Sequence, residues 1–155
     1  MKHETWLKVA EVIAKNESKC ISRKVCAIIV KDNRLVSTGH NGTPAGQPNC
    51  CDVNKNLLDE NGQLSSAESK AQHHEWSNIH EIHAEINAIM YSSFDQRNGA
   101  TLYTTLFPCK DCAKAIAGSG IKKVVYRDFY ERTPQESLTI LQEAGIEILQ
   151  LNEDR

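Results

Sequence analysis

The stretch TLYTTLFPCKDCAKAIAGSGIKKVVYRD, residues 101–128, holds the pattern that decides the fold. Residues 101–106 and 122–128 are short apolar runs typical of strands. Residues 109–120 between them are predicted to form a helix that ends at a glycine C-cap. This alternation of strand and helix predicts parallel strands within one sheet.

The chain upstream of this unit supplies a helix, a hairpin and a second helix. Residues near 3–17 carry apolar side chains at helical spacing, and residues 25–32 and 34–40 are strand-like runs. Asp32-Asn33 between those runs is a turn signal, so a β-hairpin is expected. Residues 80–93, HEIHAEINAIMYSS, are expected to be one helix with an apolar stripe facing the core: Ile82, Ile86, Ile89 and Met90.

The chain downstream completes an α/β pattern. Residues 133–145 are expected to form a helix that Thr133-Pro134 opens and Gly145 closes, and a strand follows over 146–151. The resulting order of elements predicts a mixed sheet within a single domain, residues 1–155. Residues 41 to about 77 break the pattern and are expected to be a long loop that is functional or separately pinned.

Composition narrows the classes of function. The chain has 155 residues, of which 40% are hydrophobic and 25% charged, with a net charge of −2 and no cluster of basic residues. A nucleic-acid polymer is therefore not expected as a partner, whereas a small anionic ligand is compatible with this charge. No apolar run is long enough to span a membrane, and the N-terminus resembles a helix rather than a signal peptide. A cytoplasmic protein with reduced cysteines is expected.

Two short motifs carry the chemistry. One is His83-Ala84-Glu85, and the other is Pro108-Cys109-Lys110-Asp111-Cys112. A CxxC at the start of a helix can place two thiolates on one metal ion, because the helix N-terminus favours negative charge. With one histidine added, three protein ligands leave a coordination position open, as in catalytic zinc sites.

Glu85 indicates that the metal site formed by this trio is catalytic. On one helix, residues two apart diverge by about 200°, so Glu85 is a poor co-ligand for the metal that His83 binds. A carboxylate beside a catalytic zinc can instead take a proton from the activated water and pass it onward. Each motif alone is weak, but H-x-E followed by P-C-x-x-C is the signature of zinc deaminases.

The sequence resembles the cytidine deaminase superfamily, and more closely its deoxycytidylate (dCMP) deaminases of the bacteriophage type. The resemblance covers nearly the whole chain, in ESKCISRKV, STGHNGTPAGQPNCCD, HEWSNIHEIHAEINAI, TLFPCKDCAKAIAGSGIKKVVY and AGIEI. It implies a three-layer α/β/α fold with a five-stranded mixed sheet. It also implies zinc held by His83, Cys109 and Cys112, and hydrolysis of dCMP to dUMP and ammonia, supplying dUMP for dTMP synthesis. Glu85 would protonate N3 of cytosine and then the leaving amine.

The resemblance also implies substrate contacts. Asn41 would bond the sugar 3′-hydroxyl and Ala84 would contact the substrate, while Ser22 and Lys24 would meet the 5′-phosphate and Tyr126 would add a hydroxyl. Ordinary surface or turn residues are the alternative for Asn41, Ser22 and Lys24. Family members often carry an acid-proline insertion in this segment, which this chain shortens to Ser22-Arg23-Lys24.

The resemblance also implies a second, structural zinc, held by Cys20, Cys50, His73 and Glu81. A closed site with four ligands would pin the long loop, which has little core of its own. Three neighbouring residues compete as ligands, namely Cys51, His74 and His80. Buried or incidental residues are the alternative to a metal site, and Cys26 is expected to pack as a small hydrophobe.

Many proteins of this type are hexamers that dCTP activates and dTTP inhibits. The run Gly39–Pro44 resembles the glycine-rich segment of their effector site, which makes His40, Gly42 and Thr43 candidate allosteric residues. A triphosphate effector would allow Mg²⁺ as an additional ion. Relatives usually have tyrosine at the position of His40, and a plain loop at the exit of the hairpin is the alternative.

Rival functions are a deaminase of another cytosine nucleotide, a deaminase of tRNA or single-stranded nucleic acid, and a zinc-stabilised binding module without activity. Aromatic residues make up only 6% of the chain and no basic tail is present, which disfavours the polymer substrates. Glu85 discriminates against the binding module, because a structural metal site has no use for that carboxylate.

Overall fold

The computed structural model describes residues 2–129 and 135–152, and five strands form one mixed sheet in this part of the chain. The strand order is β2-β1-β3-β4-β5. β1 runs antiparallel to both of its neighbours, and β3, β4 and β5 are parallel to one another. The strands are β1 (Cys26–Lys31), β2 (Arg34–His40), β3 (Thr101–Leu106), β4 (Lys123–Asp128) and β5 (Glu147–Gln150). The predicted mixed α/β sheet is confirmed.

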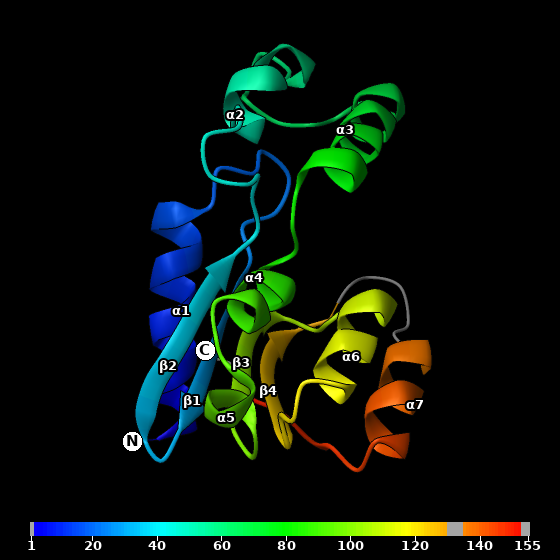
Figure 1. Cartoon of the computed structure of the whole chain (residues 1–155). Coiled ribbons are helices and arrows are strands. Elements are labelled where there is room, and N and C mark those ends of the chain that lie inside the picture. The colour runs from blue at the N-terminus through cyan, green and yellow to red at the C-terminus, as the bar shows by residue number, and fades with distance from the viewer. Residues whose placement is uncertain (1, 130–134, 153–155) are drawn as a thin grey trace.

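Helices cover both faces of this sheet, giving three layers (Figure 1). α1 (His3–Glu17) packs on one face through Trp6, Leu7 and Ala10, against Ile28 of β1. The opposite face carries α4 (Ala84–Met90), α6 (Lys110–Ala117) and α7 (Gln135–Glu143). The remaining helical segments are α2 (Cys50–Val53), η1 (Lys55–Leu57), α3 (Ala67–His80) and α5 (Phe94–Arg97).

The predicted hairpin and helix ends agree with the structure where it describes them. Asp32 and Asn33 both have positive φ angles, 50° and 57°, as a tight two-residue turn requires. α6 ends at Gly118, and Gly145 follows α7 with a φ of 73°. The predicted helix opening at Thr133-Pro134 lies outside the described residues.

Residues 41–77 were expected to lack regular structure, and this expectation is wrong. α2, η1 and most of α3 lie in that span and form a separate layer beyond the end of the sheet (Figure 1). α3 escapes detection because its side chains are polar on every side, and His73 is the one buried residue along it. Periodicity of apolar residues, the main sequence signal for helices, is therefore missing.

The single helix expected over residues 80–93 is also wrong, because the chain is extended between α3 and α4. Ile82 forms a short antiparallel bridge with Gly42, with backbone hydrogen bonds of 2.8 and 3.1 Å. The expected apolar stripe faces the core only in part, since Ile89 packs against it, Met90 is 60% exposed and the buried residues are Ala84, Glu85 and Ala88. Small residues are required there because β2 passes very close to α4.

No helix among residues 2–129 and 135–152 has the length and apolar character that a membrane span requires.

Candidate active site and metal centres

The ends of β2 and β3 bring two helix N-termini together. α4 packs beside β2, where the Asn87 side chain donates a hydrogen bond to the His40 carbonyl at 2.8 Å. α6 begins shortly after β3 ends. His83 is the N-cap of α4 and Cys109 the N-cap of α6, both with extended backbone angles. His83 therefore precedes the helix, and the angular argument that placed it on one helix with Glu85 does not apply.

His83, Cys109 and Cys112 converge on one point. His83 Nδ1 lies 3.5 Å from Cys109 Sγ and 3.3 Å from Cys112 Sγ. All three donor atoms lie within 4.8 Å of one another. Tetrahedral zinc with ordinary Zn–N and Zn–S bonds separates such donors by about 3.6 Å. One imidazole and two sulfurs at these distances fit a zinc ion that keeps a coordination position open.

The ionisation of the trio also suits a cation. Hydrogen bonds from Cys112 and His83 lower the pKa of Cys109 to about 4 despite its burial, so this sulfur is a thiolate at neutral pH. The hydrogen bond to Cys109 raises the pKa of Cys112, and the hydrogen bond with Cys109 raises the pKa of His83. The protons shared among these three side chains occupy the sulfur and nitrogen lone pairs that a metal ion would use, so metal binding would release them.

Glu85 lies in the first turn of α4 and is 5% exposed. Burial raises the pKa of its carboxyl group, a shift in the direction that helps a carboxylate to donate a proton as well as accept one. Thr104 Oγ1 of β3 lies 3.4 Å from Glu85 Oε1 and donates to the Leu106 carbonyl at 2.8 Å. The single hydroxyl hydrogen of Thr104 is thus used by the shorter bond to Leu106, and its oxygen remains in contact with the Glu85 carboxyl group. Sequence analysis missed Thr104, because nothing distinguishes it from any other strand threonine.

One cavity of about 960 Å³ connects these groups, a volume typical of small-molecule sites. His83, Cys109 and Glu85 line it, and so do three of the predicted substrate residues, Ser22, Asn41 and Ala84. Residues that sequence analysis did not single out also line it, among them Arg23, Lys70, Ser77, Lys110 and Glu136.

The structure does not bring Lys24 and Tyr126 into this cavity, contrary to the sequence-based expectation. Lys24 Nζ instead donates a hydrogen bond to the carbonyl of Lys15 in α1 at 3.3 Å. Tyr126 is 4% exposed and packs edge-on against Phe107 and Phe129, so its ring belongs to the core.

Asn41 holds the wall of the cavity in place. Its Oδ1 accepts hydrogen bonds from Ser18 Oγ at 2.7 Å and from the Val25 backbone N–H at 2.9 Å. Its Nδ2 donates to the Arg23 carbonyl at 2.7 Å. An amide nitrogen carries two hydrogens, so one N–H is left for a ligand. Asn41 therefore combines an architectural role with a free donor at the cavity.

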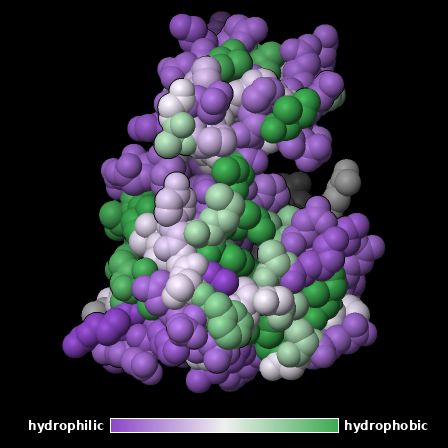
Figure 2. Space-filling model, viewed as in Figure 1, coloured by the Kyte–Doolittle hydropathy of each residue, from purple (hydrophilic) through white to green (hydrophobic). Residues whose placement is uncertain are grey.

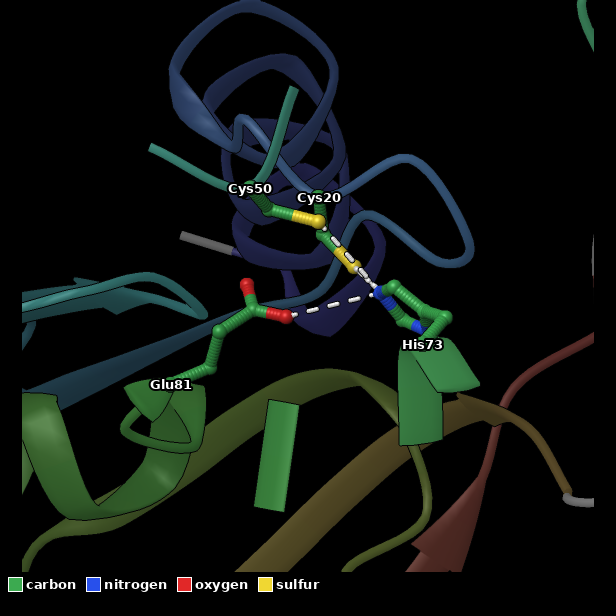
Figure 3. Close-up of side chains that lie close together, drawn as sticks. All are labelled: Cys20, Cys50, His73 and Glu81. Atoms are coloured by element: carbon green, nitrogen blue, oxygen red, sulfur yellow. Dashed lines mark hydrogen bonds and ion pairs between the residues drawn. The ribbon is translucent and has the colours of Figure 1, made fainter. Parts of the chain in front are cut away.

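A second group of donors comprises Cys20, Cys50, His73 and Glu81, whose side chains converge in Figure 3. His73 Nε2 lies 3.6 Å from Cys20 Sγ, 3.3 Å from Cys50 Sγ and 3.7 Å from Glu81 Oε1. Both carboxylate oxygens of Glu81 are buried without a hydrogen-bond partner among the described residues. A buried carboxylate without a hydrogen bond is costly, and a cation at the centre of four such donors removes that cost.

The competing ligands are absent from this group. Cys51 Sγ contacts the neighbouring Asp52 carboxylate at 3.9 Å, and His80 stacks on Trp76 with ring centroids 4.7 Å apart. His74 lines the cavity without joining the four donors. The structure thus selects one set of four from the residues that sequence analysis left open.

Gly39 of β2 is a further residue that sequence analysis did not assign to the catalytic site. A Cβ at this position would lie 2.3 Å from the Ala84 carbonyl oxygen and 2.3 Å from the Ala88 nitrogen. Only glycine permits such an approach, so Gly39 sets the position of α4 and with it Glu85.

A trio of one imidazole and two sulfurs with a buried carboxylate, at one end of a three-layer α/β/α fold, defines a class of metal-dependent hydrolase.

The comparisons with known proteins agree with this class. The family of the cytidine and deoxycytidylate deaminase zinc-binding region matches residues 1–128, and the chain belongs to this family. The deoxycytidylate deaminase of Enterobacteria phage T4 is 42% identical over 172 aligned positions, covering 96% of this chain and 89% of the relative. The deoxycytidylate deaminase of Mycobacterium phage D29 is 39% identical, covering 79% of this chain and 91% of the relative.

A solved structure extends the likeness to three dimensions. The dCMP deaminase of cyanophage S-TIM5, crystallised in complex with dCMP and dUMP, superposes with a TM-score of 0.71. It is 33% identical and covers 97% of this chain and 99% of its own. These findings confirm the predicted family, the predicted fold, the enzyme class of deaminase and the use of zinc.

Proposed function

We propose that this chain deaminates dCMP hydrolytically to dUMP and ammonia, using zinc bound by His83, Cys109 and Cys112. The observation that carries the proposal is the three-donor group, open to a cavity of about 960 Å³, with the buried Glu85 carboxyl beside it. The names of the phage relatives and the dCMP and dUMP of the cyanophage complex support the substrate.

The zinc ion, when bound, supplies a Lewis acid that makes water nucleophilic at neutral pH. Glu85 accepts the first proton of the attacking water and transfers it to N3 of the cytosine ring. It then carries the second proton of that water to the amine at C4, so that the C4–N bond breaks and ammonia leaves. Thr104 Oγ1 lies against the Glu85 carboxyl group, and Asn41 offers its remaining N–H to the sugar.

A substrate panel tests the proposal. The purified, zinc-loaded chain is offered dCMP, CMP, cytidine, dCTP and a cytosine-containing oligonucleotide, and the release of ammonia and of the uracil product is measured. We expect dCMP to have the highest kcat/KM, with one ammonia released for each dUMP. Removal of zinc by a chelator should abolish turnover and its return should restore it. Absence of dCMP turnover in a zinc-loaded sample would refute the proposal.

We further propose that Cys20, Cys50, His73 and Glu81 hold a second, structural zinc. Four donors close a tetrahedral sphere, and they tie the loop after α1 to both ends of the layer formed by α2 and α3. The Glu81 oxygens, which accept no hydrogen bond from the described residues, support a cation rather than a hydrogen-bonded cluster.

Replacing Cys50 by serine is expected to lower the bound zinc from about two to about one ion per chain, because hydroxyl oxygen is a far weaker zinc ligand than thiolate. Limited proteolysis should then cut residues 41–80 faster. Metal analysis by mass spectrometry checks the first effect and fragment mapping the second. Cys51→Ser is the matched control, since its sulfur lies outside the group. Equal zinc contents in the two variants would contradict the second site.

We also propose regulation by dCTP as activator and dTTP as inhibitor, with Mg²⁺ on the triphosphate, in a homohexamer. Support comes from the segment His40, Gly42 and Thr43, because the Gly42–Ile82 bridge joins it to the residue before His83. Exposed apolar side chains at Met90, Tyr91 and Phe94 near α4 and α5 support assembly, and Figure 2 shows apolar surface over these elements. Saturation curves for dCMP with each effector, and sedimentation of the chain, test these points.

A further inference from the structure

The face that α3 turns toward the cavity is polar throughout. Lys70, His73, His74 and Ser77 recur at helical spacing, and all four line the cavity. A helix that docks on a core presents an apolar stripe on its inward face, which this helix lacks. Hydrophilic surface also dominates the layer of α2 and α3 in Figure 2. The inward face of α3 is therefore suited to a polar ligand rather than to packing.

Lys70 is the cation on this face. Its ammonium group has no hydrogen bond or ion pair with any residue that the structure describes. It is the fourth residue of α3, near the helix end whose dipole already disfavours positive charge. Lys110, another lysine at the cavity, has a carboxylate beside it, since its Nζ lies 3.6 Å from Glu136 Oε2 in an exposed pair. Lys70 is thus a cation placed at an electrostatic cost and available to an anion.

The segment that contains Ser22 and Arg23 forms another part of the wall of this cavity. His73, one helical turn from Lys70, lies with its Nε2 3.6 Å from Cys20 Sγ, and Cys20 leads directly into that segment. Both parts of the wall belong to the cavity that also contains His83 and Glu85. The second metal group therefore fixes α3 and the Ser22–Arg23 segment relative to each other.

We propose that Lys70 is a specificity-determining residue that binds the 5′-phosphate of the substrate, together with the Ser22–Arg23 segment of the same cavity. This inference rests on the proposed function, and it gives α3 a role in substrate recognition that Lys24 was expected to fill. An ammonium group binds a phosphate dianion by a charge-assisted hydrogen bond. A nucleoside lacks that phosphate, so Lys70 affects nucleotides alone.

The test compares Lys70→Gln with the unaltered chain on ligands with and without the phosphate. Equilibrium binding of dUMP and deoxyuridine is measured by calorimetry, and kcat and KM are measured for dCMP and deoxycytidine. Loss of a hydrogen bond to a charged group predicts about 10- to 100-fold weaker dUMP binding and a similar rise in KM for dCMP. Deoxyuridine binding, deoxycytidine turnover and kcat for dCMP should stay within about twofold of the unaltered chain.

Two further variants make the test specific. Lys70→Arg should restore most of the affinity for dUMP. Lys8→Gln on α1, which removes the same charge on the opposite face of the sheet, should leave it unchanged. Equal weakening of dUMP and deoxyuridine by Lys70→Gln, or no weakening of either, would overturn the inference. An unaltered chain that prefers dUMP over deoxyuridine but does not deaminate dCMP would refute the proposed function alone.

Discussion

Replacing Glu85 by glutamine is expected to lower kcat for dCMP by at least about a thousandfold, the scale of a lost general acid–base group. Glutamine has nearly the same shape but cannot accept the proton of the attacking water or return it to N3 and the amine. Glu85 does not belong to the donor trio, so zinc content should not change. Turnover of dCMP, zinc per chain and the thermal midpoint of unfolding are the three measurements.

The stability of this variant has a predicted sign. Burial raises the pKa of Glu85, which means that the folded state disfavours the charged carboxylate. Above the ordinary carboxyl pKa the folded state carries the cost of that ionisation, whereas glutamine does not ionise. We therefore expect metal-free Glu85→Gln to unfold at the same or a slightly higher temperature than the metal-free unaltered chain at neutral pH.

Glu136→Gln is the matched control. Glu136 lines the same cavity, but its side chain is 77% exposed and paired with Lys110 at 3.6 Å. An exposed pair of this kind contributes little, so activity should change by less than about twofold. Near-normal turnover in Glu85→Gln would remove this residue from the mechanism, and loss of zinc in it would assign it a metal-binding role instead.

The catalytic trio could be predicted from the sequence because its ligands lie in two short motifs with characteristic spacing. Cys109 and Cys112 are fixed relative to each other by one helical turn, and a proline and a strand precede them. The second group is more dispersed, since Cys20, Cys50 and His73 come from three segments. Its position was predicted by resemblance, and the structure selected its members over their neighbours.

The phosphate end of the site could not be predicted in the same way. Lys24 and Arg23 are adjacent cations in sequence, and only the tertiary path of the loop turns one toward the cavity and the other toward α1. Lys70 lies in a helix without apolar periodicity, so neither its secondary structure nor its orientation has a local signal. Long-range contacts decide both.

The break between α3 and α4 has a similar cause. Residues 80–93 have helical periodicity, but Ile82 pairs with Gly42, which is 40 positions away in sequence. This bridge leaves His83 in an extended N-cap conformation, which directs its ring toward Cys109 and Cys112. A tertiary contact thus overrides a local helical preference at the position where the metal ligand is needed.

Replacing Gly39 by alanine is expected to destabilise the fold by about 2–3 kcal/mol and to lower kcat/KM for dCMP by about a hundredfold. The added methyl group would lie 2.3 Å from two backbone atoms of α4, and a rigid helix backbone cannot move aside as a flexible side chain can. Relief of the clash requires the N-terminal half of α4 to shift by about 1 Å, estimated from ordinary carbon contact distances. That shift moves Glu85 relative to the donor trio.

Gly42→Ala is the control that distinguishes this effect from a general intolerance of the segment to a methyl group in place of glycine hydrogen. Gly42 lies three residues further on, and a Cβ there would meet only the His40 ring, at 3.6 Å. Its φ is not among the positive values, so alanine adds no backbone strain. Chemical unfolding gives the stability of both variants, and dCMP kinetics are measured under conditions below the unfolding transition. Together the two measurements distinguish a displaced catalytic helix from an unfolded one. A stable Gly39→Ala variant with full activity would mean that close contact between β2 and α4 does not position Glu85.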